Sequence, residues 1–445
     1  MNIMKQTLHL LNGTLWLPLI LLGAPNHSEA TEHLLAATPP IPTETTRTPI
    51  DNLALEDCYA SALDYSQTIA IHKERLSEIQ GRFLQAFGSA LPRASFELTE
   101  KRQDGSGTSS FNLREVPEYK LALNQPLFTG FKEFATLEGV KNQRLGQSAE
   151  RSRAEQLLFR NVADAFYLLI EQREDLKILD AIRNTLVERI EELKERQRLG
   201  RSRPSELIAA QAHLRRIDAE YQRLLSQEWV ALHLMEFLTG RSPIGSLKEL
   251  PLPLTALSDE STYLANVSQR ADIQAQEAAW HGAEQEIKIA QSGFWPHVSL
   301  EGSYYTRRAG VSSGIDWDTI LKVNVPIFQG GQVRGAVREA SARARQAKRQ
   351  LEQLKREATL DIRDAYASWK AGVLKTEALA QVMEAAEANY QFQVEEYRLN
   401  LVNNLEVLQT LQALQDARRE YLHTQYETKR LFWNLQIAAG DLRLQ

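Results

Sequence analysis

Two stretches 200 residues apart decide the fold: Gln125-Pro126-Leu127-Phe128-Thr129-Gly130 and Val325-Pro326-Ile327-Phe328-Gln329-Gly330. Further matches keep this offset without a gap up to the pair Gly240 and Gly440. They include Asp164-Ala165-Phe166 with Asp364-Ala365-Tyr366, Arg198-Leu199-Gly200 with Arg398-Leu399-Asn400, Glu206 with Glu406, and Glu220-Tyr221 with Glu420-Tyr421. Because the matches fall at Pro, Gly and other positions that set backbone geometry, they predict one structural unit built twice.

Each half opens with a predicted helix, over 53–90 and 261–293, followed by a predicted pair of strands. Pro92 and Pro296 stand at the start of the first strand of each pair. Apolar side chains then alternate with polar ones, as in a half-buried strand. The alternating apolar residues are Ala94, Phe96, Leu98, Tyr119, Leu121 and Leu123 in the first half and Val298, Leu300, Tyr304, Leu321, Val323 and Val325 in the second.

Long helices follow the strands in both halves. Apolar residues recur every three or four positions, and no proline occurs from 128 to 203 or from 327 to the end. Helices of about 60–65 residues would be about 90–100 Å long at 1.5 Å per residue, a length typical of coiled coils. The predicted return helix 204–240 and the helix 261–293 are each about half as long, so they would stack end to end beside a long one.

The ends of the chain differ in composition from the repeats. Lys5, the apolar stretch 8–22 and Ser28-Glu29-Ala30 are typical of a cleaved secretory signal. The predicted organisation is a signal peptide at 1–30, a Pro/Thr-rich linker at 31–52, a first repeat at 53–240, an equatorial linker at 241–260, a second repeat at 261–440 and a tail at 441–445. The single cysteine, Cys58, excludes an internal disulfide, and the residues before it do not resemble a lipid-attachment box.

Composition excludes several classes of protein. The net charge is −5, which argues against a nucleic-acid partner. No run beyond the N-terminal segment approaches the roughly 18 apolar residues that a spanning helix needs. A membrane protein with this composition would therefore have to be a β-barrel, whose alternating strands barely raise mean hydropathy.

Four strands are too few to close a barrel, because small barrels need about eight. An open sheet edge in a bilayer would leave backbone groups without partners, so several subunits would have to share one barrel. Three subunits would supply twelve strands. Aromatic residues near the expected strand ends are candidates for the interfacial girdles: Phe128, Phe294, Trp295, Tyr304, Tyr305, Trp317 and Phe328. The alternative is a soluble hairpin packed on the helices.

This order of motifs resembles the TolC-like outer-membrane efflux family, the outer membrane factors, over residues 53 to 440. The sequence Leu53-Ala54-Leu55-Glu56-Asp57-Cys58 with Ala60 is similar to the family's opening, although Cys58 replaces the usual alanine. The remaining matches are Leu91-Pro92-x-Ala94 and Trp295-Pro296-x-Val298 before the strands, Pro126-Leu127-Phe128-x-Gly130 and Pro326-Ile327-Phe328-x-Gly330-Gly331 after them, and Arg198-Leu199-Gly200 and Tyr397-Arg398-Leu399-Asn400 at the helical turns.

The resemblance implies a mixed, mainly α fold with two β-hairpins, four strands in all. Three subunits would form a homotrimer with a shared 12-stranded transmembrane β-barrel in outer-membrane lipid and an α-barrel tunnel through the periplasm of a Gram-negative bacterium. It implies a passive exit duct of a tripartite efflux pump or a type I secretion system. A periplasmic adaptor (membrane fusion) protein and an inner-membrane pump of the resistance-nodulation-division or ABC type would be its partners. The alternative is a periplasmic coiled-coil adaptor or scaffold, and the cargo stays open.

The helical turns are the best-defined candidate sites. Gly200 suits the left-handed conformation that ends a helix, and Asn400 is the next most tolerant residue for it. Pro204 suits the first position of a returning helix, and Asn403 with Glu406 resembles a capping box. The resemblance implies that the tips contact the adaptor through Leu199, Gly200, Arg201, Ser202, Leu399, Asn400, Leu401 and Val402. The alternative is that these residues only turn the chain.

Two glutamates before the second tip, Glu384 and Glu387, share a helix face. In a trimer an inward-facing carboxylate becomes a ring of three, and such rings select cations and gate pores. The alternative is a solvated outer face. The sequence contains no His-Glu-x-x-His, cysteine pair, phosphate loop or Gly-x-Ser-x-Gly, so we expect no enzyme activity, metal or cofactor.

Overall fold

The computed structural model describes residues 52–440 except 106, 108, 243 and 253–257. These residues belong to one structural unit, which begins at Pro49. The predicted signal peptide, nearly all of the Pro/Thr-rich linker and the predicted C-terminal tail lie outside the described residues.

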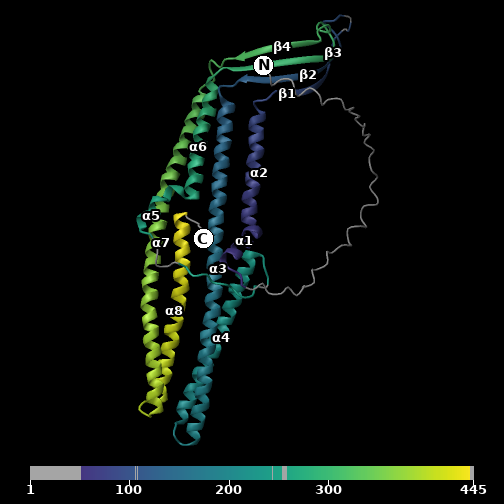
Figure 1. Cartoon of the computed structure of the whole chain (residues 1–445). Coiled ribbons are helices and arrows are strands. Elements are labelled where there is room, and N and C mark those ends of the chain that lie inside the picture. Colours follow the sequence, from purple (N-terminus) through teal and green to yellow (C-terminus); the bar gives the residue numbers. More distant parts are fainter. Residues whose placement is uncertain (1–51, 106, 108, 243, 253–257, 441–445) are drawn as a thin grey trace, which may run out of the picture. The chain divides into compact units, whose positions relative to one another are not determined.

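The chain builds the same set of elements twice (Figure 1). The first half contains α1 (Leu55–Tyr65), α2 (Gln67–Gly88), β1 (Arg93–Arg102), β2 (Glu115–Phe128), α3 (Lys132–Arg198) and α4 (Pro204–Thr239). The second contains α5 (Glu260–Ala265), η1 (Val267–Gln269), α6 (Ala271–Gln291), η2 (Ser292–Phe294), β3 (His297–Arg308), β4 (Trp317–Asn324), α7 (Gln332–Arg398) and α8 (Asn404–Ala439). Both long helices have 67 residues and both return helices have 36, as the sequence repeat requires.

The opening helix of each half is broken, where the sequence predicted one continuous helix. In the first half the break falls at Ser66, whose hydroxyl accepts a hydrogen bond from the Ile69 N–H and so starts α2. In the second half α5 ends at Ala265 and α6 begins only at Ala271, after the turn η1. Because of these breaks, α1 does not continue the axis of α2, and α5 does not continue the axis of α6.

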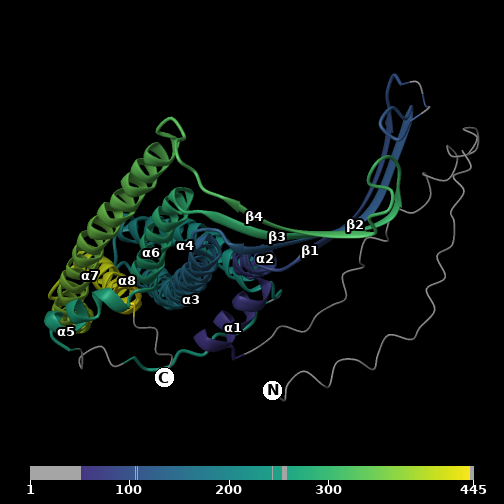
Figure 2. The same cartoon turned by 90° about the horizontal axis from the view of Figure 1, so that it is seen from above.

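The strands form one four-stranded antiparallel sheet in the order β1-β2-β3-β4 (Figure 2). Sequence patterning predicted two isolated hairpins, but β2 pairs with β3 from Glu118↔Arg308 to Phe128↔Val298. The reason is that β2 leads into α3 and β3 follows α6, and these two helices pack on each other. Among the described residues, the outer edges of β1 and β4 have no strand partner.

The helices pack as two sets that share α3 and α7. Near the sheet, α3 lies between α2 and α6, and α6 packs on α7. Beyond the middle of the long helices, α4 packs on α3, α8 packs on α7, and α3 also contacts α8 (Figure 1). The long helices therefore run through both sets, while each half-length helix takes part in one.

Half-length helices stack end to end, but not in the predicted pairing of 204–240 with 261–293: α4 ends beside the start of α2, and α8 ends beside the start of α6. A Cβ added to Gly240, after α4, would lie 2.5 Å from the Tyr65 ring just before α2. After α8, the Arg270 guanidinium before α6 donates to the Ala438 carbonyl oxygen at 3.0 Å. The residues after these helices, Gly240 and Gly440, both have positive φ, which favours glycine.

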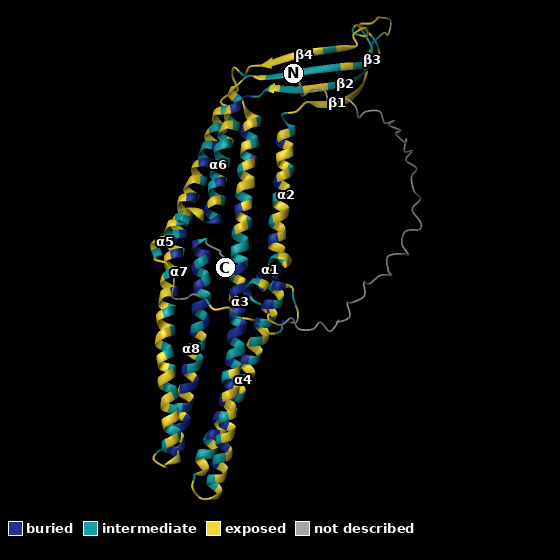
Figure 3. Ribbon diagram, viewed as in Figure 1, coloured by how far each residue is buried: buried dark blue, intermediate teal, exposed yellow. Residues whose placement is uncertain are grey.

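The core follows the helices as separate clusters. The largest lies at the middle of α3 and includes Phe159, Phe166 and Leu169. A second lies between the lower helices and includes Leu179, Leu186 and Leu193. Cys58 is fully buried in the first, and burial raises the pKa of its thiol to about 12, so it stays protonated. Figure 3 shows that buried residues concentrate on the helices, whereas the strand residues other than Pro117 are exposed or intermediate.

Candidate functional site: a two-faced sheet and two helical tips

One face of the sheet is apolar, and none of the described residues covers it. Phe96 pairs with Leu121, Leu121 pairs with Tyr304, and Tyr304 pairs with Trp317, so one cross-strand row is apolar from edge to edge. A second row runs through Leu300 and Leu321. The exposed fractions of the large apolar side chains on this face lie between 37% and 67%: Phe96, Leu98, Leu121, Leu123, Leu300, Tyr304, Trp317, Leu321 and Val323. A soluble protein rarely exposes so continuous an apolar surface.

The opposite face carries a network of charged side chains. The Lys120 ammonium lies 3.3 Å from both Glu97 and Glu118, and the Lys322 ammonium lies 3.5 Å from Glu301. Near the far turns, Arg308 pairs with Glu118 and the Tyr305 hydroxyl donates to Asp318 at 2.9 Å. The predicted aromatic Tyr305 therefore belongs to the polar face, whereas Tyr304 and Trp317 belong to the apolar one.

The same contrast continues where the strands meet the helices. An aromatic groove lines one side of α3 and contains Phe83, Phe87, Phe131, Phe134 and Trp295. A polar groove lines the other side and contains Arg82, Gln85, Arg93, Asn124, Lys132, Glu133 and His297. At about 100° per residue, the α3 residues of the two grooves fall on opposite sides of the helix. The wall formed by α2, α3 and α6 thus has a polar side and an aromatic side.

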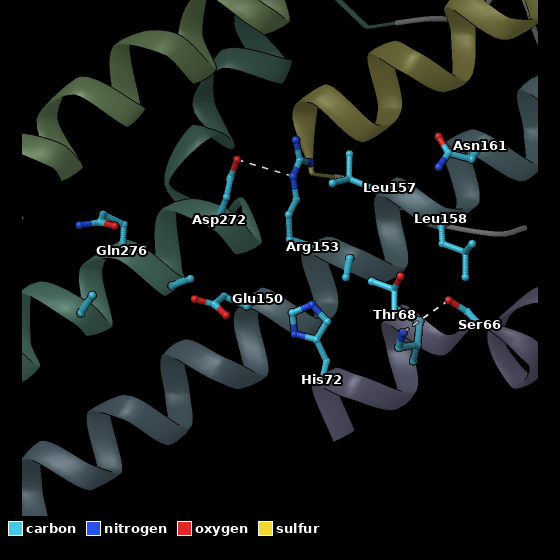
Figure 4. A pocket seen from close by; sticks show the side chains of 14 residues that line it. Ser66, Thr68, His72, Glu150, Arg153, Leu157, Leu158, Asn161, Asp272 and Gln276 are labelled. Atoms are coloured by element: carbon cyan, nitrogen blue, oxygen red, sulfur yellow. Dashed lines mark hydrogen bonds and ion pairs between the residues drawn. The ribbon is translucent and has the colours of Figure 1, made fainter. Parts of the chain in front are cut away.

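A recess of about 540 Å³, lined by both polar and apolar side chains, lies further down α3 (Figure 4). Glu150 and Asn161 of α3 line it and lie on the same side of that helix as the polar groove. The Arg153 guanidinium lies 3.6 Å from Asp272 and donates to the Ile437 carbonyl oxygen at 3.1 Å. Burial opposes ionisation of Asp272, but the hydrogen bond from Arg270 and the charge of Arg153 outweigh it and lower its pKa.

The sequence of this chain is similar to those of known outer-membrane proteins. A family model described as "Outer membrane efflux protein" matches residues 265–441. "Proteases secretion protein PrtF" of Dickeya chrysanthemi is 25% identical over 342 residues, covering 73% of each chain. "Outer membrane protein TolC" of Escherichia coli is 21% identical over 402 residues, 84% of this chain and 78% of TolC. These comparisons show that the chain is similar to the TolC-like outer membrane factors over most of its length.

The TolC-like fold is also found in solved structures. The outer membrane protein VceC from Vibrio cholerae superposes with a TM-score of 0.76 at 20% identity, covering 87% of this chain and 96% of VceC. The predicted fold class is confirmed, with long helices and two hairpins in each chain. No helix among the described residues has an apolar run long enough to cross a membrane. Nor do the described residues contain a cluster of His, Cys, Asp or Glu side chains able to hold a metal ion.

The first tip of this TolC-like chain ends α3 with a Schellman motif. The Gly200 N–H donates to the Gln197 carbonyl oxygen at 2.9 Å, and the Arg201 N–H donates to that of Arg196 at 2.8 Å. Gly200 has φ of 69°, the left-handed value that the sequence predicted. Pro204 begins α4, also as predicted.

The second tip repeats the motif without a glycine. The Asn400 N–H donates to the Tyr397 carbonyl oxygen at 3.0 Å, the Leu401 N–H donates to that of Glu396 at 2.9 Å, and Asn400 has φ of 59°. Asn403 caps α8, because its side-chain oxygen accepts from the Leu405 and Glu406 N–H groups. The predicted capping box is formed in part: the Glu406 carboxylate contacts the Asn403 side chain at 3.1 Å.

Both tips present exposed leucines. The exposed fractions are 63% for Leu199, 66% for Leu399 and 71% for Leu401. Gly200, Arg201 and Asn400 are exposed as well, while Ser202 and Val402 are intermediate. The Ser202 hydroxyl donates to Glu206 at 2.6 Å and Val402 packs against the lower core cluster, so these two residues also hold the turns in shape.

The contact that joins the two hairpins just above the tips could not be predicted from the sequence. The Tyr397 ring, 4% exposed, lies between two guanidinium groups of the other hairpin: Arg189 at 3.8 Å and Arg196 at 4.4 Å from its centroid. Arg189 also donates to the side-chain oxygen of Asn404 at 3.0 Å. The signal in the sequence was an aromatic residue beside the turn, but its partners lie some 200 positions earlier and cannot be found by local pattern.

Further ion pairs continue this junction between α8 and the first hairpin. Arg419 binds both oxygens of Asp175, at 2.7 and 2.9 Å, and also Glu220 at 2.9 Å. Glu171, which is buried, accepts from Arg430 at 2.9 Å and contacts His423 at 2.7 Å. Such partly buried, bidentate pairs fix the relative position of the hairpins more firmly than surface pairs do.

The two predicted acidic-ring residues have different surroundings. Glu387 of α7 forms an ion pair with Arg418 of α8 within the same hairpin, so its charge is compensated. Glu384 is exposed and forms no ion pair with another described residue. The chain places both on α7 but brings neither into a cluster with the tip residues.

Proposed function

We propose that this chain is one subunit of a trimeric outer-membrane channel, the passive exit duct of a tripartite efflux pump or a type I secretion system. The observation that carries the proposal is the four-stranded sheet with one bare apolar face, one ion-paired face and two unpaired edges. Lipid covers such an apolar face without any further protein layer, and the charged face suits a water-filled lumen. A periplasmic adaptor or scaffold would have no use for an uncovered apolar sheet.

The unpaired edges require other copies. Along the sheet β1 to β4 alternate in direction, so β4 of one copy is antiparallel to β1 of the next, and the same pairing closes a ring. Each strand edge left open in lipid would cost several kcal/mol per backbone group. Three copies give twelve strands, which is the count we propose. In this ring the polar groove and recess beside α3 face the lumen, and the aromatic groove faces outward at the membrane boundary.

The tips are the proposed docking surface for a periplasmic adaptor protein. They carry exposed leucines on rigidly capped turns, and apolar anchors on a pre-formed surface are what a partner's helical hairpin can bind without ordering the turn. An inner-membrane pump would supply the energy, because family members are channels rather than enzymes. PrtF is named for protease secretion and the relative CusC for cation efflux, so we leave the class of pump and the cargo open.

Membrane fractionation tests the channel itself. The full chain, expressed in a Gram-negative host, should appear in the outer-membrane fraction as an oligomer that resists SDS unless it is heated. Reconstituted in planar bilayers, the oligomer should conduct ions. Recovery of the protein as a soluble periplasmic monomer would rule the proposal out.

Site-directed photo-crosslinking tests the tips. A photoreactive residue at Leu199 or Leu399 should capture an adaptor of constant mass in cells that contain the complete pump. Phe237 is a matched control, since it is 74% exposed on α4 but remote from the turns. An equal yield of the same product at Phe237 would contradict docking at the tips.

A further inference from the structure

A stripe of basic side chains runs along the half of α7 that lies nearer the sheet. Its members are Arg334, Arg338, Arg345, Arg349, Arg356, Arg363 and Lys370, and all are exposed. At about 100° per residue, these side chains fall within roughly 60° of one another around the helix. The stripe is about 54 Å long at 1.5 Å per residue.

Few acidic groups neutralise this arginine stripe. Arg349 pairs with Glu352 at 2.8 Å, and Arg363 pairs with Glu260 of α5 at 3.4 Å. Arg338, Arg345 and Arg356 form no ion pair with another described residue. The chain as a whole has a net charge of −5, and several of its helices carry ion pairs between residues three or four positions apart. A row of mostly unpaired positive charges along one helix therefore stands out, and it attracts a polyanion.

The stripe lies on the outer side of the proposed duct. On α6, Gln276 and Glu286 lie on the side of the recess, and they contact Gln350 and Arg343 of α7. Those two α7 residues are roughly 140° around the helix from the stripe at about 100° per residue.

We infer that the arginine stripe binds the carboxylate-bearing polymer that surrounds a periplasmic duct, the peptidoglycan. This inference rests on the proposed function, which places α7 between the outer membrane and the pump. Guanidinium groups bind carboxylates in a two-pronged geometry, and the stem peptides of peptidoglycan carry free carboxylates along an extended strand. The stripe would attach the tunnel to the peptidoglycan through the half of α7 that lies next to the sheet.

Two other occupants fit the stripe less well. Lipid headgroups would lie at the end of α7 next to the sheet, so they would not reach Arg356 and Arg363 farther along the helix. In the proposed ring, α7 of one copy would lie beside α2 of the next. The glutamates of α2 alternate with cations, and Glu78 already pairs with Arg82 at 2.6 Å, so α2 offers little free negative charge to the stripe. Neither occupant accounts for a row of cations over this whole length.

Co-sedimentation with purified peptidoglycan sacculi tests the inference. The detergent-purified native oligomer should pellet with sacculi at low salt, and about 0.5 M NaCl should release it. Replacing Arg338, Arg345 and Arg356 together by Gln should lower the affinity about tenfold. The matched control replaces Lys73, Arg75 and Arg144 by Gln, three exposed cations of α2 and α3, and should leave the affinity unchanged.

Three results would overturn the inference. They are unaltered binding by the α7 triple variant, an equal loss in the control variant, and capture by anionic phospholipid vesicles in place of sacculi. The duct proposal is checked on the same samples, through the heat-labile oligomer in the outer-membrane fraction. A variant that assembles normally but no longer binds sacculi supports the stripe; an assembled wild type that never binds sacculi refutes it without affecting the duct.

Discussion

At the scale of single residues, the two tips form the same left-handed helix end with different residues. Gly200 and Asn400 occupy the same left-handed position of the same hydrogen-bonded motif, with φ of 69° and 59°. A residue with a branched Cβ is strained there, whereas glycine is not. The sequence repeat predicted both conformations, because each residue stands directly after a helix that no proline interrupts.

Substitution at these positions should therefore have opposite effects. We expect Gly200→Val to destabilise the first tip by about 1–2 kcal/mol and Asn400→Gly to leave the second unchanged or slightly more stable. Hydrogen exchange at the ends of α3 and α7 would measure each tip separately. Equal protection of the α3 end in the wild type and in Gly200→Val would contradict the expectation.

A buried histidine gives the helical portion a dependence on pH. His213 of α4 is 7% exposed, and its Nε2 atom has no hydrogen-bond partner among the described residues. Burial, with a smaller contribution from Arg216, lowers its pKa below the ordinary value of 6.5. The unfolded chain therefore binds a proton more readily than the folded one, so stability should fall as pH drops below about 6.5.

The measurement is thermal unfolding at pH 7.5 and 5.5. His213→Leu should reduce the loss of stability between these values, because it removes the group whose burial opposes protonation. His233→Leu is the control, since the His233 side chain is 72% exposed. A pH dependence identical in the His213→Leu variant and in the wild type would show that other groups cause it.

At the scale of elements, the α3–α8 junction decides how the two hairpins sit together. Its contacts join residues about 200 positions apart, and they combine buried cation–π pairs near the tips with bidentate ion pairs higher up. Helical periodicity predicted each helix and its apolar stripe. It does not specify which helix lies beside which, since any apolar stripe fits several others in the absence of a register-setting polar contact.

Removing the ring between the two arginines should loosen this junction. We expect Tyr397→Ala to leave two partly buried guanidinium groups without their partner and to let the tips move apart. Spin labels at residues 199 and 399 would report a broader and longer distance distribution than in the wild type. Tyr65→Ala is the control, because it removes an aromatic side chain near the Gly240 junction and should leave the tip distance unchanged.

At the scale of the whole molecule, the sheet requires an environment that one chain does not provide. Among the described residues, its apolar face is uncovered and its edge strands have no partner, while its opposite face carries ion pairs. Burial of the apolar face in lipid without pairing of the edges would leave backbone groups unpaired in the bilayer. Pairing of the edges without lipid would leave the apolar face exposed to water, so the two steps are favourable only together.

A pair of neighbouring substitutions separates the two faces. Leu121 lies on the apolar face and Ala122 on the polar face of the same strand. Leu121→Lys should cost roughly 2–4 kcal/mol in the bilayer and lower the yield of heat-labile oligomer in the outer membrane. Ala122→Lys should assemble normally. Equal yields from both variants would show that this face does not contact lipid.

The sequence by itself determined the repeat, the alternation of the strands, the long helices and the conformation of both turns. These features depend on side chains within a few positions of each other, through backbone preferences and periodicity. The tertiary structure alone decided that the hairpins join into one sheet, that the opening helices break, and that Tyr397 lies between Arg189 and Arg196. Such contacts join residues far apart in sequence, and local pattern carries no information about which distant partner has the matching shape and charge.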